Sequence, residues 1–187
     1  MRKFLVLCSA ILLSFGVCAT NSIGQQDKSQ RPSPPQQAVF HFADGKTVTV
    51  DYSSPRAKGR KIFGGLVPYG QVWRAGANEA TTFVTDTAVT VGGKSVPAGA
   101  YTLFTIPNAD KWTLIISKTT KNDKGGPLWG TNYAGESQDL ARTDMKVSSL
   151  PAPVENFTIA LDKVGNGTSL RMDWETTRAS VEISEAK

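Results

Sequence analysis

The sequence predicts an all-β fold, an antiparallel β-sandwich of roughly eight to ten strands that carries two long irregular loops. Apolar and polar residues alternate with a period of two from Ala38 onward. The alternating runs are short and end at Gly, Pro, Asn or Asp, and no stretch has a convincing long amphipathic helix. Because each strand then has one apolar face, two antiparallel sheets packed face to face would bury those faces most economically.

The first expected hairpin joins a strand containing Phe40 to a strand containing Val48. A two-residue turn would pair His41 with Val48 and mix the polar and apolar faces, because directly paired residues share one side of a sheet. A three-residue loop at 43–45, with Gly45 in the left-handed conformation, pairs Phe40 with Val48 instead. We therefore predict the longer loop, with His41 on the face opposite the core.

Further strands are expected wherever the alternation returns, and a hairpin is expected around residues 108–110. The runs are Phe83 to Val91, Tyr101 to Ile106, Trp112 to Ile116, Phe157 to Leu161, Leu170 to Trp174 and Val181 to Ile183. Residues 138–145 leave two alternatives open, a short helical turn or a strand that includes residues 144–147.

Residues 1–19 have the features of an export signal. A basic start, Arg2-Lys3, precedes an apolar run that is too short to span a bilayer, and Ala19 supplies a small residue at the expected cut. Cleavage after Ala19 is favoured over lipid attachment at Cys18, because Val17 is a poor match to the small residue expected before a lipid-modified cysteine. We expect an exported protein, periplasmic or extracellular, with no transmembrane segment in its mature form.

Removal of this leader changes the chemistry of the chain. Both cysteines, Cys8 and Cys18, lie within it, so the mature protein has no disulfide and no cysteine metal site. Two of the 21 basic residues also lie there, which lowers the net charge to about +3 and makes a nucleic-acid partner unexpected. His41 is the only histidine, so a zinc site with two histidines is excluded. No metal or cofactor is expected, and the oligomeric state stays open.

The remainder of the chain divides into a tether and a domain. Residues 20–37 are rich in Gln, Ser and Pro and have few apolar side chains, which predicts a disordered tether. Residues 38–187 then form the β-sandwich domain.

The longer irregular segment, residues 53–80, interrupts the alternation. Segments of this length inside a compact domain are usually functional loops or disordered ones. Its many apolar residues, among them Ile62, Phe63, Leu66 and Trp73, favour a packed loop. The second segment, residues 118–140, contains Gly125-Gly126 and is expected to form a mobile flap.

Residues 54–81 and 97–107, followed by Trp129-Gly130, Tyr133, Asp139 with Arg142, and Trp174-Glu175, resemble the signature of an uncharacterised exported bacterial family, domain of unknown function 2911. The resemblance extends from about Val39 to Ile183. It implies a β-rich exported domain and carries no established activity or ligand.

Four cations, Arg56, Lys58, Arg60 and Lys61, lie within six residues of the first loop. If the turn gathers them around a phosphate, sulfate or carboxylate, they form an anion site. The alternative is a solvated loop whose charges point into water.

Arg74, Asn78 and Glu79 place a guanidinium, an amide and a carboxylate in one glycine-containing turn. They are candidate ligand-binding residues. The alternative is a buried Arg74–Glu79 ion pair, with Asn78 capping the turn.

Aromatic residues occur in both loops. Tyr69 and Trp73 in the first, with Trp129 and Tyr133 in the second, would offer stacking surfaces for a sugar or another ring if the loops meet. The alternative is that these rings belong to the core.

These residues support two functional hypotheses. The first is a non-catalytic exported domain that binds a small polar or anionic ligand, a carbohydrate-like ligand or a cell-envelope component. The second is a hydrolase of glycosides or polysaccharides in which Glu79 and Asp139 act as the carboxylate pair.

Overall fold

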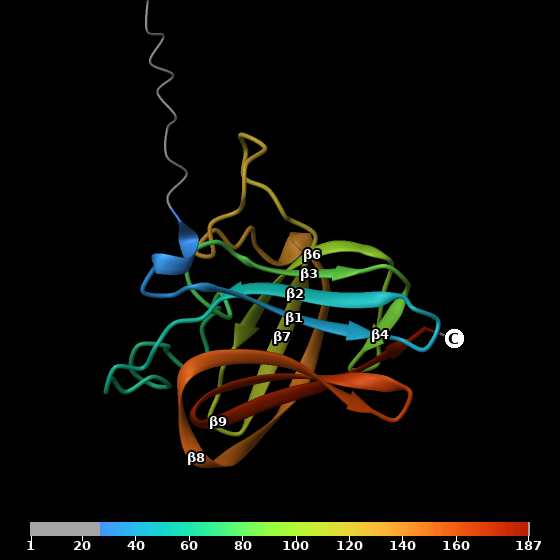
Figure 1. Cartoon of the computed structure of the whole chain (residues 1–187). Coiled ribbons are helices and arrows are strands. Elements are labelled where there is room, and N and C mark those ends of the chain that lie inside the picture. Colours follow the sequence, from blue (N-terminus) through green and yellow to red (C-terminus); the bar gives the residue numbers. More distant parts are fainter. Residues whose placement is uncertain (1–26, 187) are drawn as a thin grey trace, which may run out of the picture.

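The computed structural model describes residues 27–186, and the predicted leader lies outside them. Nine strands form one antiparallel sheet in the order β1-β2-β3-β6-β7-β8-β9-β4-β5 (Figure 1). The strands are β1 (Pro35–His41), β2 (Thr47–Ser53), β3 (Thr81–Thr85), β4 (Val89–Val91), β5 (Lys94–Val96), β6 (Gly99–Ile106), β7 (Lys111–Ser117), β8 (Asp139–Val164) and β9 (Gly167–Glu185). Two three-residue 3-10 turns, η1 (Lys28–Gln30) and η2 (Glu136–Gln138), are the helical elements within this range.

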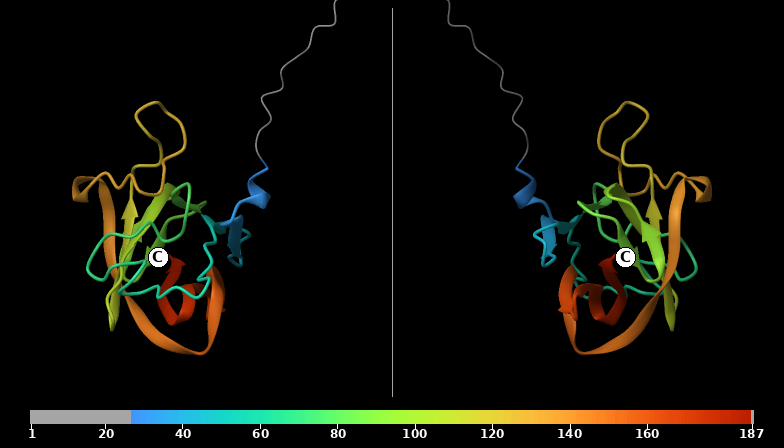
Figure 2. Two further views of the ribbon diagram at one scale, coloured as in Figure 1. Left: turned by 90° about the vertical axis from the view of Figure 1, so that its left-hand side faces the viewer. Right: turned by 90° about the vertical axis from the view of Figure 1, so that its right-hand side faces the viewer.

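The predicted all-β antiparallel class is confirmed, but the strands form one continuous sheet rather than two separate ones. The cause is the length of β8 and β9, which run for 26 and 19 residues. Their register shifts between Ser149 and Val154 and again between Val154 and Thr158, and the interruption contains Pro151 and Pro153, which have no N–H to donate. The bent β8–β9 ribbon therefore carries the sheet around the core (Figures 1 and 2).

The first hairpin has the predicted register, with Phe40 opposite Val48. Gly45 has a φ of +85°, and the Phe42 N–H donates to the Lys46 carbonyl oxygen over 2.8 Å, which closes the three-residue loop. His41 is exposed, as expected, while Phe40 is only partly buried because β1 is an edge strand.

Of three other expected segments, one differs from the prediction and two agree with it. The run from 83 to 91 is split into β3 and β4, which lie far apart in the strand order. Residues 139–145 belong to β8, so the strand alternative holds there. The hairpin around residues 108–110 is confirmed by the pairing of Ile106 with Thr113.

The expected tether is partly ordered. Residues 35–37 pair with β2 as the start of β1, and the Ser54 N–H donates to the Pro34 carbonyl oxygen over 2.9 Å. The physical reason is that backbone pairing and side-chain contacts fix this segment without apolar burial. Within the described residues, no helix is long and apolar enough to cross a membrane.

Five aromatic rings form the centre of the core. Trp73 stacks on Trp174 with ring centroids 5.9 Å apart and contacts Phe157 edge-on at 5.0 Å. Phe63 and Trp112 complete the cluster at 5.0 Å from each other. Loop and strand side chains thus pack together, which confirms that the first loop is packed rather than disordered.

Candidate functional site

The two irregular segments meet, which the sequence could not establish. The Gly130 N–H donates to the Asn78 carbonyl oxygen and the Ala80 N–H donates to the Leu128 carbonyl oxygen, each over 2.9 Å. Glu79 and Trp129 pair between them in an antiparallel bridge. Gly130 is required here, because a Cβ would lie 2.7 Å from Arg74 Cδ.

A small cavity of about 200 Å³, which we call the loop-junction cavity, lies where the two irregular segments meet. Both loops and strand β6 contribute to its wall, which consists of Val72, Trp73, Arg74, Phe104, Gly130, Thr131 and Tyr133. Reciprocal backbone hydrogen bonds of 2.7 and 2.8 Å between Trp73 and Thr105 hold the first loop against β6. Three of the predicted site residues, Trp73, Arg74 and Tyr133, therefore line one cavity.

Arg74 is half-buried and fixed by its own turn. Its Nε donates to the Gly76 carbonyl oxygen over 3.1 Å, and within residues 27–186 its terminal amino groups have no hydrogen-bond or ion-pair partner. The following residue, Ala75, has a φ of +49°, a strained value for a residue with a side chain. The alternative of an Arg74–Glu79 ion pair is not found in the described structure, so Arg74 presents an unneutralised guanidinium to the cavity.

Tyr133 is held in place by a hydrogen-bond triangle. Its hydroxyl donates to Asp139 Oδ2 over 2.8 Å, Arg142 Nε donates to the same oxygen over 2.7 Å, and an Arg142 amino group donates to the Tyr133 hydroxyl over 2.8 Å. Burial, followed by the hydrogen bond to Asp139, raises the pKa of the Tyr133 phenol, while Arg142 acts in the opposite direction. Tyr133 therefore stays neutral, with its ring edge-on to Phe104 at 5.1 Å.

Asp139 contributes to this triangle through Oδ2, which accepts from both Tyr133 and Arg142. Its hydrogen bond raises the pKa of Arg142, and its side chain is only 7% exposed. Its second oxygen, Oδ1, is buried without a partner in the described structure and is not part of the cavity wall.

Glu79 binds the N-terminal segment instead of Arg74. Arg31 contacts both carboxylate oxygens, at 3.0 and 2.9 Å, and Lys28 lies 2.9 Å from Oε1. Beside it, the Asn78 side-chain amide donates to the Ser33 carbonyl oxygen over 3.0 Å. Burial alone would raise the pKa of Glu79, but hydrogen bonds from Lys28, its own backbone N–H and Arg31 lower it to about 2.

The carboxylate pair of the hydrolase hypothesis is therefore divided between two networks. Glu79 lines a separate cavity of about 250 Å³ with Arg31 and Lys28, whereas Asp139 binds Tyr133 and Arg142. A carboxylate with a pKa of about 2 is a poor general acid near neutral pH. The cavity that Glu79 lines does not include Asp139.

The cationic cluster also lies elsewhere, against the bend of β8. The Lys58 N–H donates to Glu155 Oε1 over 2.9 Å, and Arg56 forms a backbone bridge with Asn156. Arg60 caps its own turn through hydrogen bonds to the carbonyl oxygens of Arg56 and Ala57. These residues do not line the loop-junction cavity, and their charged groups are exposed.

The remaining aromatic candidates have different positions from those expected. Tyr69 and Trp129 are 45% and 47% exposed and stay outside the cavity wall. Trp73 belongs mainly to the aromatic core, as the alternative proposed, and also reaches the cavity.

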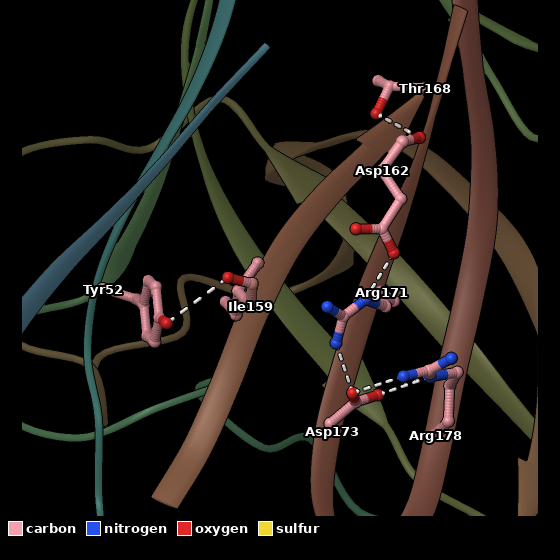
Figure 3. Close-up of polar contacts among 7 residues, drawn as sticks. All are labelled: Tyr52, Ile159, Asp162, Thr168, Arg171, Asp173 and Arg178. Carbon is pink, nitrogen blue, oxygen red and sulfur yellow. Dashed lines mark hydrogen bonds and ion pairs between the residues drawn. The ribbon is translucent and has the colours of Figure 1, made fainter. Parts of the chain in front are cut away.

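Sequence reasoning missed a network of four charges on the β8–β9 ribbon (Figure 3). Arg171 bridges Asp162 and Asp173, and Arg178 donates to both oxygens of Asp173 over 2.8 and 2.7 Å. Asp173 is 3% exposed, and its hydrogen bond raises the pKa of Arg178. The available signal was the pair of charges at Arg171 and Asp173, which alternate with buried Met172.

This network fastens the ribbon rather than forming a pocket. The Thr168 hydroxyl donates to the Asp162 carbonyl oxygen over 2.9 Å, and the Tyr52 hydroxyl donates to the Ile159 carbonyl oxygen over 3.3 Å, which links β2 to β8 (Figure 3). Within residues 27–186, no group of three or more metal-ligating side chains is close enough to hold an ion.

Residues 33–183 match the family model described as protein of unknown function DUF2911. The chain belongs to this family. The match covers the whole sheet except its last residues, together with both loops, and it assigns no activity or ligand. No curated protein and no solved structure matches the chain.

Proposed function

We propose that this DUF2911 protein is an exported, non-catalytic domain that binds a small anionic, carbohydrate-like ligand in the loop-junction cavity. Export rests on the leader at residues 1–19. If the leader is cut after Ala19, the secreted protein has no thiol, which intact-mass measurement and thiol titration would test. A lipid on Cys18 would contradict that cleavage site.

The single observation that carries ligand binding is the state of Arg74. A half-buried guanidinium whose terminal amino groups have no acceptor in the described protein is costly unless water or a ligand satisfies it. Arginine binds carboxylate and phosphate oxygens through parallel N–H donors. An anionic group of the ligand therefore belongs at Arg74.

The rest of the cavity wall favours a ring. Phe104 and Tyr133 present aromatic surface, and the Thr131 hydroxyl adds a polar group. A volume of about 200 Å³ is smaller than the 300–1,000 Å³ typical of drug-sized sites, which favours a single ring over an oligomer. We infer that the ligand is one sugar-sized ring with a carboxylate, the class represented by uronic acids.

The cavity wall contains no group suited to catalysis. Glu79 lies in another cavity, and burial together with the hydrogen bond to Asp139 raises the pKa of Tyr133 and keeps its phenol neutral. These observations favour binding over hydrolysis.

The test is a chemical-shift titration of the protein with glucuronate and, separately, with glucose. We expect glucuronate to bind and to shift the resonances of Arg74 and Tyr133, with glucose at least about tenfold weaker because it lacks the charged acceptor. Arg74→Gln should weaken glucuronate binding by about 10- to 100-fold.

Arg56→Gln is the matched control, because it removes an exposed arginine outside the cavity. Equal binding of glucuronate and glucose, or equal loss of affinity in the two variants, would contradict the proposal.

A further inference from the structure

The outer part of the first loop exposes apolar side chains to solvent. Among the described residues, six large hydrophobic side chains are exposed, and three of them lie between positions 66 and 72. They are Leu66 at 49%, Tyr69 at 45% and Val72 at 39% exposure. Such a concentration on one short segment is typical of an interaction surface.

An ordered, hydrogen-bonded turn holds Leu66 in solvent. The Leu66 N–H donates to the Lys61 carbonyl oxygen over 3.1 Å, and the Val67 N–H donates to the Ile62 carbonyl oxygen over 2.9 Å. Ile62 and Val67 are buried on either side of this turn and anchor it in the core. Leu66 is therefore held outward by a turn whose flanking residues are fixed.

The same loop carries a positive charge that is not neutralised. Arg56, Lys58, Arg60 and Lys61 are exposed, and within residues 27–186 none of them forms an ion pair. Glu155 accepts the backbone N–H of Lys58, and Glu155 and Glu175 line one cavity with Arg60 and Lys61. Residues 56–72 themselves contain these four cations and no acidic residue, so the segment has a net positive charge.

One cation and one apolar side chain of the loop, Lys61 and Tyr69, are adjacent in space. A Cβ built at Gly64 would lie 3.0 Å from the Tyr69 ring and 3.9 Å from Lys61 Cε, so both side chains pack over this glycine. In Figure 1 the loop, drawn in teal, projects to one side of the sheet.

We propose that residues 56–72 dock this domain on an anionic lipid surface. Leu66 and Val72 would enter the boundary between headgroups and acyl chains, Tyr69 would lie at headgroup level, and the four cations would face the lipid phosphates. An acidic polysaccharide would satisfy the cations, but it offers no apolar phase for Leu66. Membrane docking is a second property, distinct from ligand binding in the loop-junction cavity. Because Val72 also lines that cavity, docking would place the cavity beside the membrane.

The test is co-sedimentation with vesicles of phosphatidylcholine alone or with about 30% phosphatidylglycerol. We expect binding to the anionic vesicles at about 10 mM salt and its loss near 1 M, because the Debye length falls from about 30 to 3 Å. Lys58→Gln with Lys61→Gln should lower the partition coefficient by about 25-fold, since each cation near the surface contributes about fivefold. Leu66→Ser should lower it by about tenfold.

Lys163→Gln with Val164→Ser is the matched control, because it removes an exposed cation and an exposed aliphatic side chain from the β8–β9 turn. All variants are made as the mature protein from Thr20 onward, so the contribution of the segment before residue 27 cancels in the ratios, and thermal melts check that each variant folds. Equal binding to neutral and anionic vesicles, or an equal loss in the control, would overturn the proposal. Binding to soluble polygalacturonate without any binding to vesicles would also overturn it.

Discussion

Replacing Glu79 with glutamine should detach the N-terminal segment from the loop junction and lower the free energy of unfolding by about 1–2 kcal/mol at pH 7. Glu79 accepts hydrogen bonds from Arg31 at 3.0 and 2.9 Å and pairs with Lys28 at 2.9 Å. The Glu79 and Arg31 side chains are 27% and 25% exposed. That exposure places the pair between a surface ion pair, which contributes about 0–1 kcal/mol, and a buried charged hydrogen bond, which contributes about 1.5–3 kcal/mol.

The contribution of Glu79 should depend on pH in a defined direction. Its pKa in the folded protein is about 2, below its ordinary value of 4.5, so the ionised form favours the fold. The stabilisation is therefore complete above about pH 4.5 and is lost as the pH falls toward 2. The difference in stability between the wild type and Glu79→Gln should shrink over that window.

Urea unfolding of the wild type, Glu79→Gln, Arg31→Gln and the double variant would measure both effects. We expect a coupling energy of about 1 kcal/mol at pH 7 and close to zero at pH 2. Glu182→Gln is the control, because that carboxylate is exposed and has no ion pair in the described structure. Two results would refute this reasoning. One is that the losses of stability in the two single variants simply add in the double variant at pH 7. The other is that Glu79→Gln loses the same stability at pH 2 as at pH 7.

Three further changes test the scaffold by denaturant unfolding. Asp173→Asn should lower the free energy of unfolding by about 2–3 kcal/mol, because it leaves two arginines without their buried partner. Asp144→Asn, whose side chain is 66% exposed, should lower it by less than about 0.5 kcal/mol. Phe157→Ala should lower the free energy of unfolding by about 3–5 kcal/mol, because it opens a cavity in the aromatic core. Trp129→Ala should lower it by less than about 1 kcal/mol, because the Trp129 side chain is 47% exposed. Similar losses in the two variants would mean that the core is wrongly assigned. Gly45→Ala should cost about 1–2 kcal/mol because of its φ of +85°, and no loss would argue against the three-residue loop.

Features set by neighbouring residues were predictable from the sequence. The alternation around Phe40 and Val48, together with a glycine that tolerates a positive φ, determined the loop and register of the first hairpin. The single sheet was not predictable in this way. It depends on how far β8 and β9 continue through the prolines at 151 and 153, and on which remote strands they then meet.

The candidate site shows the same division between local and remote information. Arg74 and Tyr133 were predicted as site residues from the composition of the two loops, and the structure brings them to one cavity. The partner of Glu79 was not predictable, because Arg31 lies 48 residues away in a segment with the composition of a tether. A charged side chain in such a segment carries no sequence signal of its partner.

The position of Arg31 changes which residue of the Arg74, Asn78 and Glu79 turn is free to bind a ligand. Glu79 is neutralised by the N-terminal segment, and Asn78 donates its amide to Ser33 in that same segment. Arg74 has no equivalent partner, since its one side-chain bond in the described structure is to the carbonyl oxygen of Gly76 in its own turn. Had Arg74 neutralised Glu79, its removal would have left a buried charge unpaired and destabilised the fold. Because it does not, loss of Arg74 should leave folding nearly intact, and its guanidinium is available to the cavity that both loops enclose.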